Sequence, residues 1–162
     1  MQKQPFDIDQ AITRIEEAVK PYPKAAMFEL FDEGFTTPFE QLAACILSIR
    51  TYDEVSLVCA QRLFALARTP QAMVQLPIAQ IDAAIGQSTF HERKAPQIQA
   101  IAQRILAEFD GELPCDPAVL ISFQGVGPKC AHLALGIACG EAYISVDIHV
   151  HRVTNRWGYV QA

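Results

Sequence analysis

Long hydrophobic runs are absent from this sequence: no window approaches the ~18 consecutive apolar residues that a membrane-spanning helix requires. The first seven residues, Met1 to Asp7, also lack the apolar core of a secretory signal. We therefore expect a cytoplasmic protein with no membrane partner.

A large excess of charge of one sign is also absent. Charged residues make up 19% of the chain and the formal net charge is −5, which excludes a charge-rich coiled coil and an indiscriminate polyanion binder. The charge is uneven, because residues 125–162 hold three basic and two acidic side chains. This last part of the chain leaves room for a local nucleic-acid face.

Cysteine pairs at C-x-x-C spacing are missing. The odd number and scattered positions of the cysteines predict neither a disulfide framework nor a zinc site. We expect most of them to be buried thiols in a reducing compartment. The five are Cys45, Cys59, Cys115, Cys130 and Cys139.

Signals for the start of a helix are abundant. Asp7 or Asp9 precedes an apolar stripe at helical spacing. Capping boxes, in which an N-cap threonine is followed three positions later by glutamate, open predicted helices at Thr37 and at Thr51. The only β-like stretch is residues 142–146. We therefore expect an all-α protein of about nine or ten short helices.

Two glycines separate the predicted helix that begins after Asp116 from the one that begins at Pro128 or Lys129. Gly125 and Gly127 permit a tight turn and the close approach of another backbone. The amides of Gly125, Val126 and Gly127, with the N-terminus of the next helix, would form a cradle for a DNA backbone phosphate. On spacing alone, an ordinary helix corner with glycine caps explains the same residues.

The sequence around this turn resembles the helix-hairpin-helix DNA glycosylases, in particular their endonuclease III-like members. The run from Leu120 to Ala131 resembles the family hairpin, and it is followed by matching stretches at residues 146–150 and 152–156. Upstream segments resemble the same family in the same order, so the likeness covers roughly Pro38 to Tyr159. These segments are Pro38-Phe39-Glu40, Leu47-Ser48, Asp53, Thr69 to Met73, Lys94-Ala95 and Gly111 to Pro114.

The resemblance implies two catalytic residues. An unprotonated amine can attack the deoxyribose C1′, displace a damaged base and form a Schiff base. The family assigns this role to the lysine that matches Lys129, and it assigns the stabilisation of oxocarbenium-like charge to the aspartate that matches Asp147. Relatives with purely hydrolytic activity usually have no lysine at this place. Two simpler roles stay open: Lys129 as a solvated lysine after a turn, and Asp147 as a helix N-cap.

The family also fills the gap left by a flipped nucleotide with residues from two loops. One loop matches Ser48 to Thr51, and the other matches Thr89 to His91. Arg50 stands where the family usually has glutamine, and Phe90 stands where it often has leucine. Because of both departures, the resemblance does not define the substrate range. A simpler role also stays open for Arg50, that of a surface arginine at a helix end.

The histidines do not suggest a metal site. His149 and His151 are two positions apart, which suits neither ligation from adjacent helical turns nor a catalytic triad. We predict that His149 packs or contacts a DNA phosphate, and that the chain holds no metal.

The function implied by the resemblance is base excision repair. It is that of a DNA glycosylase that removes oxidised pyrimidines from damaged double-stranded DNA, with AP-lyase activity (β-elimination) through a Schiff base on Lys129. We expect a monomer. Three alternatives stay open: a monofunctional glycosylase of the same superfamily, a non-catalytic DNA-binding module, and a helical interaction domain unrelated to DNA.

The resemblance further implies a helical barrel domain over residues 37–141, which contains the helix-hairpin-helix at 116–139. Residues 1–36 and 142–162 would form parts of a second helical lobe. Family members usually continue through a run of four closely spaced cysteines that ligate a 4Fe-4S cluster, and no such run is present here. We therefore expect a chain truncated at its C-terminus, with no cluster within residues 1–162. On its own, such a fragment is expected to be poorly stable and weakly active or inactive. A cluster is expected only if the native chain continues beyond Ala162.

Overall fold

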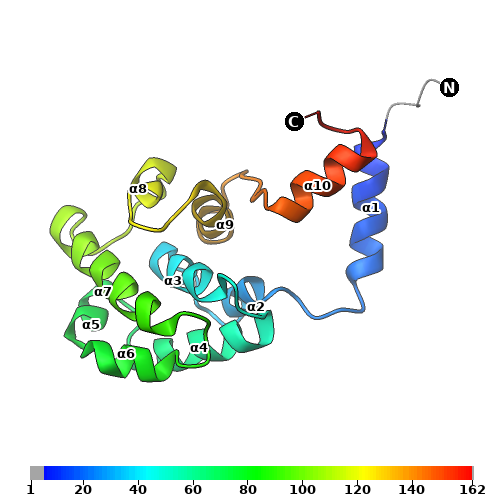
Figure 1. Ribbon diagram of the computed structural model, residues 1–162. Helices are drawn as coiled ribbons and strands as arrows, with labels where there is room; N and C mark the ends of the chain where they lie inside the picture. The colour runs from blue at the N-terminus through cyan, green and yellow to red at the C-terminus, as the bar shows by residue number, and fades with distance from the viewer. Residues whose placement is uncertain (1–5, 162) are drawn as a thin grey trace. The chain divides into compact units, whose positions relative to one another are not determined.

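The computed structural model describes residues 6–161, which form ten helices and no strand (Figure 1). The all-α class predicted from the sequence is confirmed, and the β-like stretch at 142–146 is not a strand. No helix in the described part of the chain is both long and apolar enough to cross a bilayer. The helices are α1 (Ile8–Val19), α2 (Ala26–Asp32), α3 (Pro38–Ser48), α4 (Asp53–Leu66), α5 (Pro70–Gln75), α6 (Ile78–Ala84), α7 (His91–Glu108), α8 (Pro117–Ile121), α9 (Pro128–Ala138) and α10 (Ile148–Trp157).

The chain divides into two compact units. The larger is Ala25–Ser145, and the smaller combines Met1–Lys24 with Val146–Ala162. The larger unit thus includes residues 25–36 and 142–145, which lie outside the barrel range expected from the sequence. The reason at its N-terminal end is α2, which sequence analysis did not identify: Ala26, Met27 and Leu30 are buried, and the helix packs on α3, α4 and α9.

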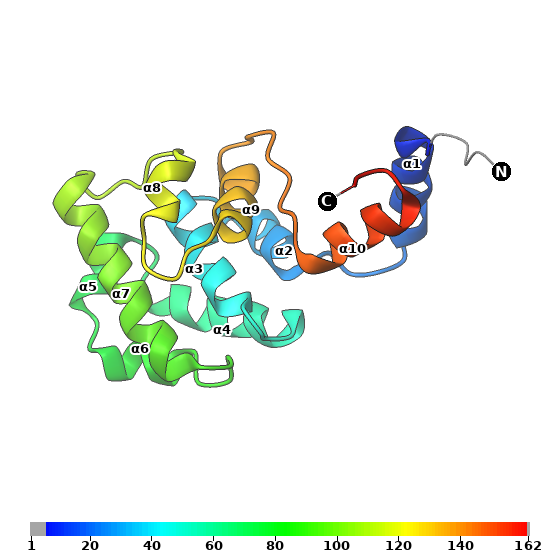
Figure 2. The same cartoon turned by 45° about the horizontal axis from the view of Figure 1, so that its top comes forward.

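Helix α3 is the centre of the larger unit. Every residue from Phe39 to Leu47 is buried, because α2, α4, α7 and α9 all pack against this helix. Figure 2 shows α9 on one side of α3 and α4 on the other. From Leu42 to Leu47 the sequence has no polar residue, and enclosure of this stretch on all sides is the expected consequence.

The capping box predicted at Thr37 is formed. The Thr37 hydroxyl accepts from the Glu40 amide at 3.2 Å, and the Glu40 carboxylate accepts from the Thr37 amide at 3.0 Å. Glu40 is buried and also accepts from Arg68 Nε at 2.7 Å. A charge in the core is thereby paired, as burial requires.

The box predicted at Thr51 is wrong. Helix α4 begins at Asp53, and its N-cap residue Tyr52 makes no side-chain cap hydrogen bond. The Thr51 hydroxyl instead lies 3.3 Å from Ser88 Oγ and accepts from the Thr89 amide at 3.1 Å. The Thr51 hydroxyl therefore bonds to residues distant in the sequence and does not form the helix cap that the local signal predicted.

The smaller unit contains α1 and α10. Asp7 caps α1, as predicted, and the Phe6 ring stacks on Trp157 with 4.8 Å between ring centroids. Neither helix has a buried residue, and Ile12 and Val150 remain 46% and 39% exposed. This unit has little core of its own.

Candidate active site and nucleic-acid interface

The hairpin between α8 and α9 has one residue that requires glycine. Gly125 has φ +80°, and a Cβ at this position would lie 2.6 Å from Gln97 Nε2, whereas Gly127 is an extended N-cap with φ −99°. The predicted outward-facing amide of Val126 is wrong, because this N–H donates to the Phe123 carbonyl at 3.1 Å and the side chain is buried. The groups that remain available to bind a phosphate are the amides of the two glycines and those of the first turn of α9.

Helix α7 braces the hairpin from outside the motif. Gln97 Nε2 donates to the Gln124 carbonyl at 2.8 Å, and Arg104 Nη1 donates to the Ser122 carbonyl at 3.0 Å. The Arg104 guanidinium also lies 4.9 Å from the centroid of the Phe123 ring. Because α7 precedes the hairpin by many residues, no local sequence signal indicates these contacts.

Lys129 lies in the first turn of α9 and is exposed. The N–H groups of a first helical turn have no partner within the helix and carry positive potential. The next residue, Cys130, is buried, and its hydrogen bond with Cys45 and its burial hold the pKa of this thiol well above its usual range. Cys130 is therefore a neutral packing residue, and Lys129 is the candidate nucleophile of this turn.

Asp147 is the N-cap of α10. Its Oδ1 accepts from the His149 and Val150 amides, both at 2.9 Å. The capping role is confirmed, and the His149 side chain beside it is exposed. Lys129 belongs to the larger unit and Asp147 to the smaller.

Arg50 and Phe90 come together although they are 40 positions apart in the sequence. The Arg50 guanidinium lies 5.9 Å from the centroid of the Phe90 ring, and both residues are exposed. Both have left-handed backbones, with φ +57° and +61°. Large side chains rarely adopt this conformation unless the surrounding structure imposes it. We call this pair the Arg50–Phe90 edge.

Lys94, which the sequence analysis gave no role of its own, is buried directly beneath this edge. Its Nζ donates to the Leu47 and Ile49 carbonyls at 2.9 and 2.8 Å and to Ser88 Oγ at 2.9 Å. Burial lowers the pKa of Lys94 from 10.5 to about 8. A single lysine early in a helix gives no sequence signal for such a site, because most lysines are exposed.

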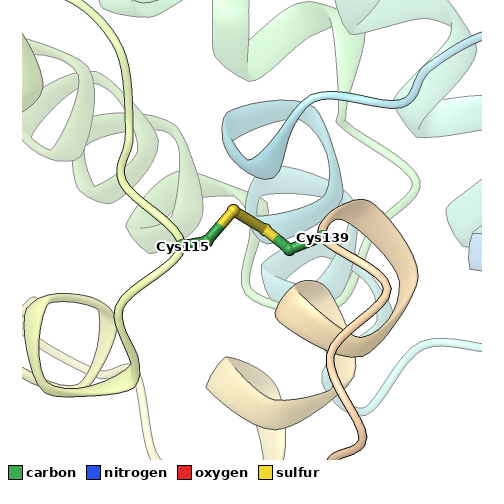
Figure 3. Close-up of a disulfide and its surroundings, with 2 residues drawn as sticks. All are labelled: Cys115 and Cys139. Atoms are coloured by element: carbon green, nitrogen blue, oxygen red, sulfur yellow. A yellow bond between two sulfur atoms is a disulfide. The ribbon is translucent and has the colours of Figure 1, made fainter.

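A disulfide joins Cys115 and Cys139, with 6.2 Å between their Cα atoms (Figure 3). The expectation of no disulfide is therefore wrong for this pair, whereas Cys45, Cys59 and Cys130 are buried thiols as expected. Cys115 precedes α8 and Cys139 follows α9, so the bond closes a loop around the whole hairpin motif. Spacing alone could not indicate it, because only the packing of α8 on α9 brings the two residues together.

Replacing both Cys115 and Cys139 by serine is expected to destabilise the larger unit. A crosslink over 24 positions restricts the unfolded chain by about 3 kcal/mol. Denaturant unfolding of the oxidised protein and the double variant measures the loss. Equal midpoints, or five titratable thiols in the unfolded non-reduced protein, would contradict the bond.

Metal ligands do not gather in residues 6–161: no three His, Cys, Asp or Glu side chains there are placed to hold an ion. Two cysteines are joined to one another and the other three lie in the core. These cysteines do not fit a 4Fe-4S cluster, which needs four thiolate ligands close together.

The chain matches the family described as "HhH-GPD superfamily base excision DNA repair protein" over residues 43–162. It is 31% identical to endonuclease III of Thermotoga maritima over 145 residues, which are 90% of this chain and 65% of that protein. It is 33% identical to endonuclease III of Escherichia coli K12 over 147 residues, which are 91% of this chain and 66% of that protein. The chain thus spans slightly less than two thirds of the length of these relatives.

Solved structures share this fold. A non-covalent endonuclease III–DNA complex matches with a TM-score of 0.75 at 29% identity, over 96% of this chain and 71% of that chain. A trapped covalent endonuclease III–DNA intermediate matches with the same TM-score and identity. A thermostable thymine-DNA glycosylase matches in fold with a TM-score of 0.70 at 19% identity.

Proposed function

Because the chain belongs to the HhH-GPD superfamily of base excision DNA repair proteins, we propose that it is a DNA glycosylase with AP-lyase activity. Its substrate is damaged double-stranded DNA that contains an oxidised pyrimidine. The observation that carries the proposal is the position of Lys129, an exposed amine in the first turn of α9 directly after the Gly125–Gly127 hairpin.

Lys129 supplies the nucleophile. Its neutral Nζ attacks the deoxyribose C1′, and the glycosidic bond breaks with its electron pair leaving on the base, which takes up a proton. The resulting secondary ammonium loses one proton, and opening of the sugar ring, in which O4′ takes up a proton, gives a protonated Schiff base. Removal of a proton from C2′ then expels the 3′ phosphate, and water releases Lys129.

Asp147 supplies the negative charge. As the sugar loses the base, positive charge develops at C1′ and the ring oxygen, and a carboxylate facing it lowers the energy of the transition state. We propose this role for Asp147 because the resemblance to endonuclease III-like glycosylases assigns it to the matching aspartate.

The DNA would be held mainly by its backbone. The amides of Gly125 and Gly127 and the N-terminus of α9 bind a phosphate, and His149 contacts a second one. The Arg50–Phe90 edge enters the stack where the target nucleotide leaves it. Few cationic side chains are required, which fits the net charge of −5. We propose that the protein acts as a monomer.

The experiment that tests this function uses a labelled duplex with a single oxidised thymine. Incubation with the protein should release the base and nick the strand without alkali. Base release that is revealed only by alkaline cleavage would indicate a monofunctional glycosylase. Binding with neither reaction would indicate a DNA-binding module, and no binding would exclude a DNA function.

We also propose that residues 1–162 bind no iron–sulfur cluster. Iron content and visible absorption of the purified chain, prepared anaerobically with iron and sulfide supplied, should match those of a cysteine-free control protein. Stoichiometric iron in this chain would contradict the proposal.

A further inference from the structure

We propose that Lys94 is a positioning residue, whose buried ammonium fastens residues 47–51 to Ser88 and so holds Arg50 and Phe90 together as one DNA-inserting edge. The inference rests on the proposed function for what the edge does. The fastening itself is a property of the protein without DNA.

The contacts of Lys94 span two segments that are far apart in the sequence. Its Nζ donates to the carbonyls of Leu47 and Ile49, at the end of α3, and to Ser88 Oγ, before α7. Thr51 Oγ1 lies 3.4 Å away. An ammonium has three N–H donors and accepts nothing. These three short contacts therefore use its full donor capacity.

Hydroxyl groups complete the connection. Ser88 Oγ lies 3.0 Å from the Leu47 carbonyl oxygen and 3.3 Å from Thr51 Oγ1. The Thr89 amide donates to Thr51 Oγ1 at 3.1 Å. Ser88 is buried, at 1% exposure, so this network is shielded from competing water. We call Lys94, Ser88 and Thr51 the Lys94 latch.

The latch encloses both residues of the edge. Arg50 lies between Ile49 and Thr51, which both contact Lys94 Nζ, and the Phe90 carbonyl accepts from the Lys94 amide at 3.1 Å. Ile49 and Thr51, which flank Arg50, and Thr89, which precedes Phe90, are thereby fixed. This accounts for two large residues with positive φ that face one another across the loops.

The chemistry requires such rigidity. Extruding a nucleotide costs unstacking and unpairing energy, and a side chain that fills the gap recovers it only if its position is set beforehand. A pair of exposed residues on two free loops would lose this advantage. Burial lowers the pKa of Lys94 to about 8, so at neutral pH the ammonium form with three donors predominates.

The test compares Lys94→Met with Gln99→Met. Methionine keeps an unbranched side chain but removes all donors. Gln99 is the matched control, because it lies in the same helix, is buried, and donates to the Leu76 carbonyl at 2.6 Å, away from the edge. Ser88→Ala is the milder second variant, which decides the outcome if Lys94→Met does not fold.

The first measurement is amide hydrogen exchange without DNA. Exchange in residues 48–51 and 88–91 should rise about tenfold in Lys94→Met, and less in Ser88→Ala, with no change in Gln99→Met. Unchanged exchange in both segments would overturn the latch, whatever the protein does to DNA.

The second measurement is single-turnover base release. Lys94→Met should slow release from a fully paired lesion about tenfold more than release from a mismatched lesion, where extrusion costs less. This additional slowing on the paired lesion should disappear when Lys94→Met is introduced into the double variant Arg50→Ala/Phe90→Ala, because the latch would then have no edge to position. An equal loss on both substrates, or undiminished additional slowing in that double variant, would overturn the role. Failure of the wild-type protein to release any base would contradict the proposed function. The hydrogen-exchange measurement without DNA would still test the latch.

Discussion

Lys129→Gln is expected to abolish the covalent adduct that borohydride traps between this protein and an abasic duplex. Glutamine cannot form a Schiff base, so no adduct above background should appear on a denaturing gel. Affinity for the damaged duplex should stay within about tenfold, or ~1.4 kcal/mol, of the wild-type value, because in the proposed interface backbone amides rather than this side chain hold the phosphate.

Lys20→Gln is the matched control for this loss of charge. Lys20 is also an exposed lysine, but it lies at the end of α1. Its variant should be trapped as efficiently as the wild-type protein. Trapping that persists in Lys129→Gln would refute the assignment of the nucleophile.

Asp147→Asn is expected to slow base release by about two to three orders of magnitude, as the loss of positioned charge stabilisation typically does. Asparagine caps helices nearly as well as aspartate, so the hydrogen bonds to the His149 and Val150 amides can persist. The defect would then lie in the chemistry and not in the folding of α10. Single-turnover rates with thermal unfolding of the same variant separate the two.

Asp116→Asn provides the control for this substitution. Asp116 caps α8 in the same way, with Oδ1 accepting from the Ala118 amide at 2.8 Å. We expect its rate to stay close to that of the wild-type protein. If the rate of base release by Asp147→Asn also stayed within about threefold of the wild-type rate, Asp147 would be only a helix cap, with no role in catalysis.

The helices of this fold could be predicted where a local signal governs them. The caps at Asp7, Thr37, Thr69, Asp116 and Asp147 each form a hydrogen bond with an amide two or three residues later, so adjacent sequence determines them. Helix α2 has no such signal, since its N-cap Ala25 has no side-chain acceptor. Its position depends on burial against distant helices, which the sequence does not display.

The candidate site was predictable in part for the same reason. Gly125, Lys129 and Asp147 lie within or beside short motifs that can be recognised in the sequence. The Lys94 latch and the disulfide each join residues that are brought together only by the packing of the helices. The same effect explains the error at Thr51, where a hydroxyl group bonds across two loops and leaves the local cap unformed.

We propose that this chain cleaves damaged DNA through Lys129. The most direct test of this proposal is to reduce the wild-type protein with borohydride on an abasic duplex, digest the adduct with protease and nuclease, and map the modified residue by mass spectrometry. We expect the adduct on the peptide that contains Lys129 and on no other lysine. Absence of an adduct, or modification of Lys94 or the N-terminal amine instead, would contradict it.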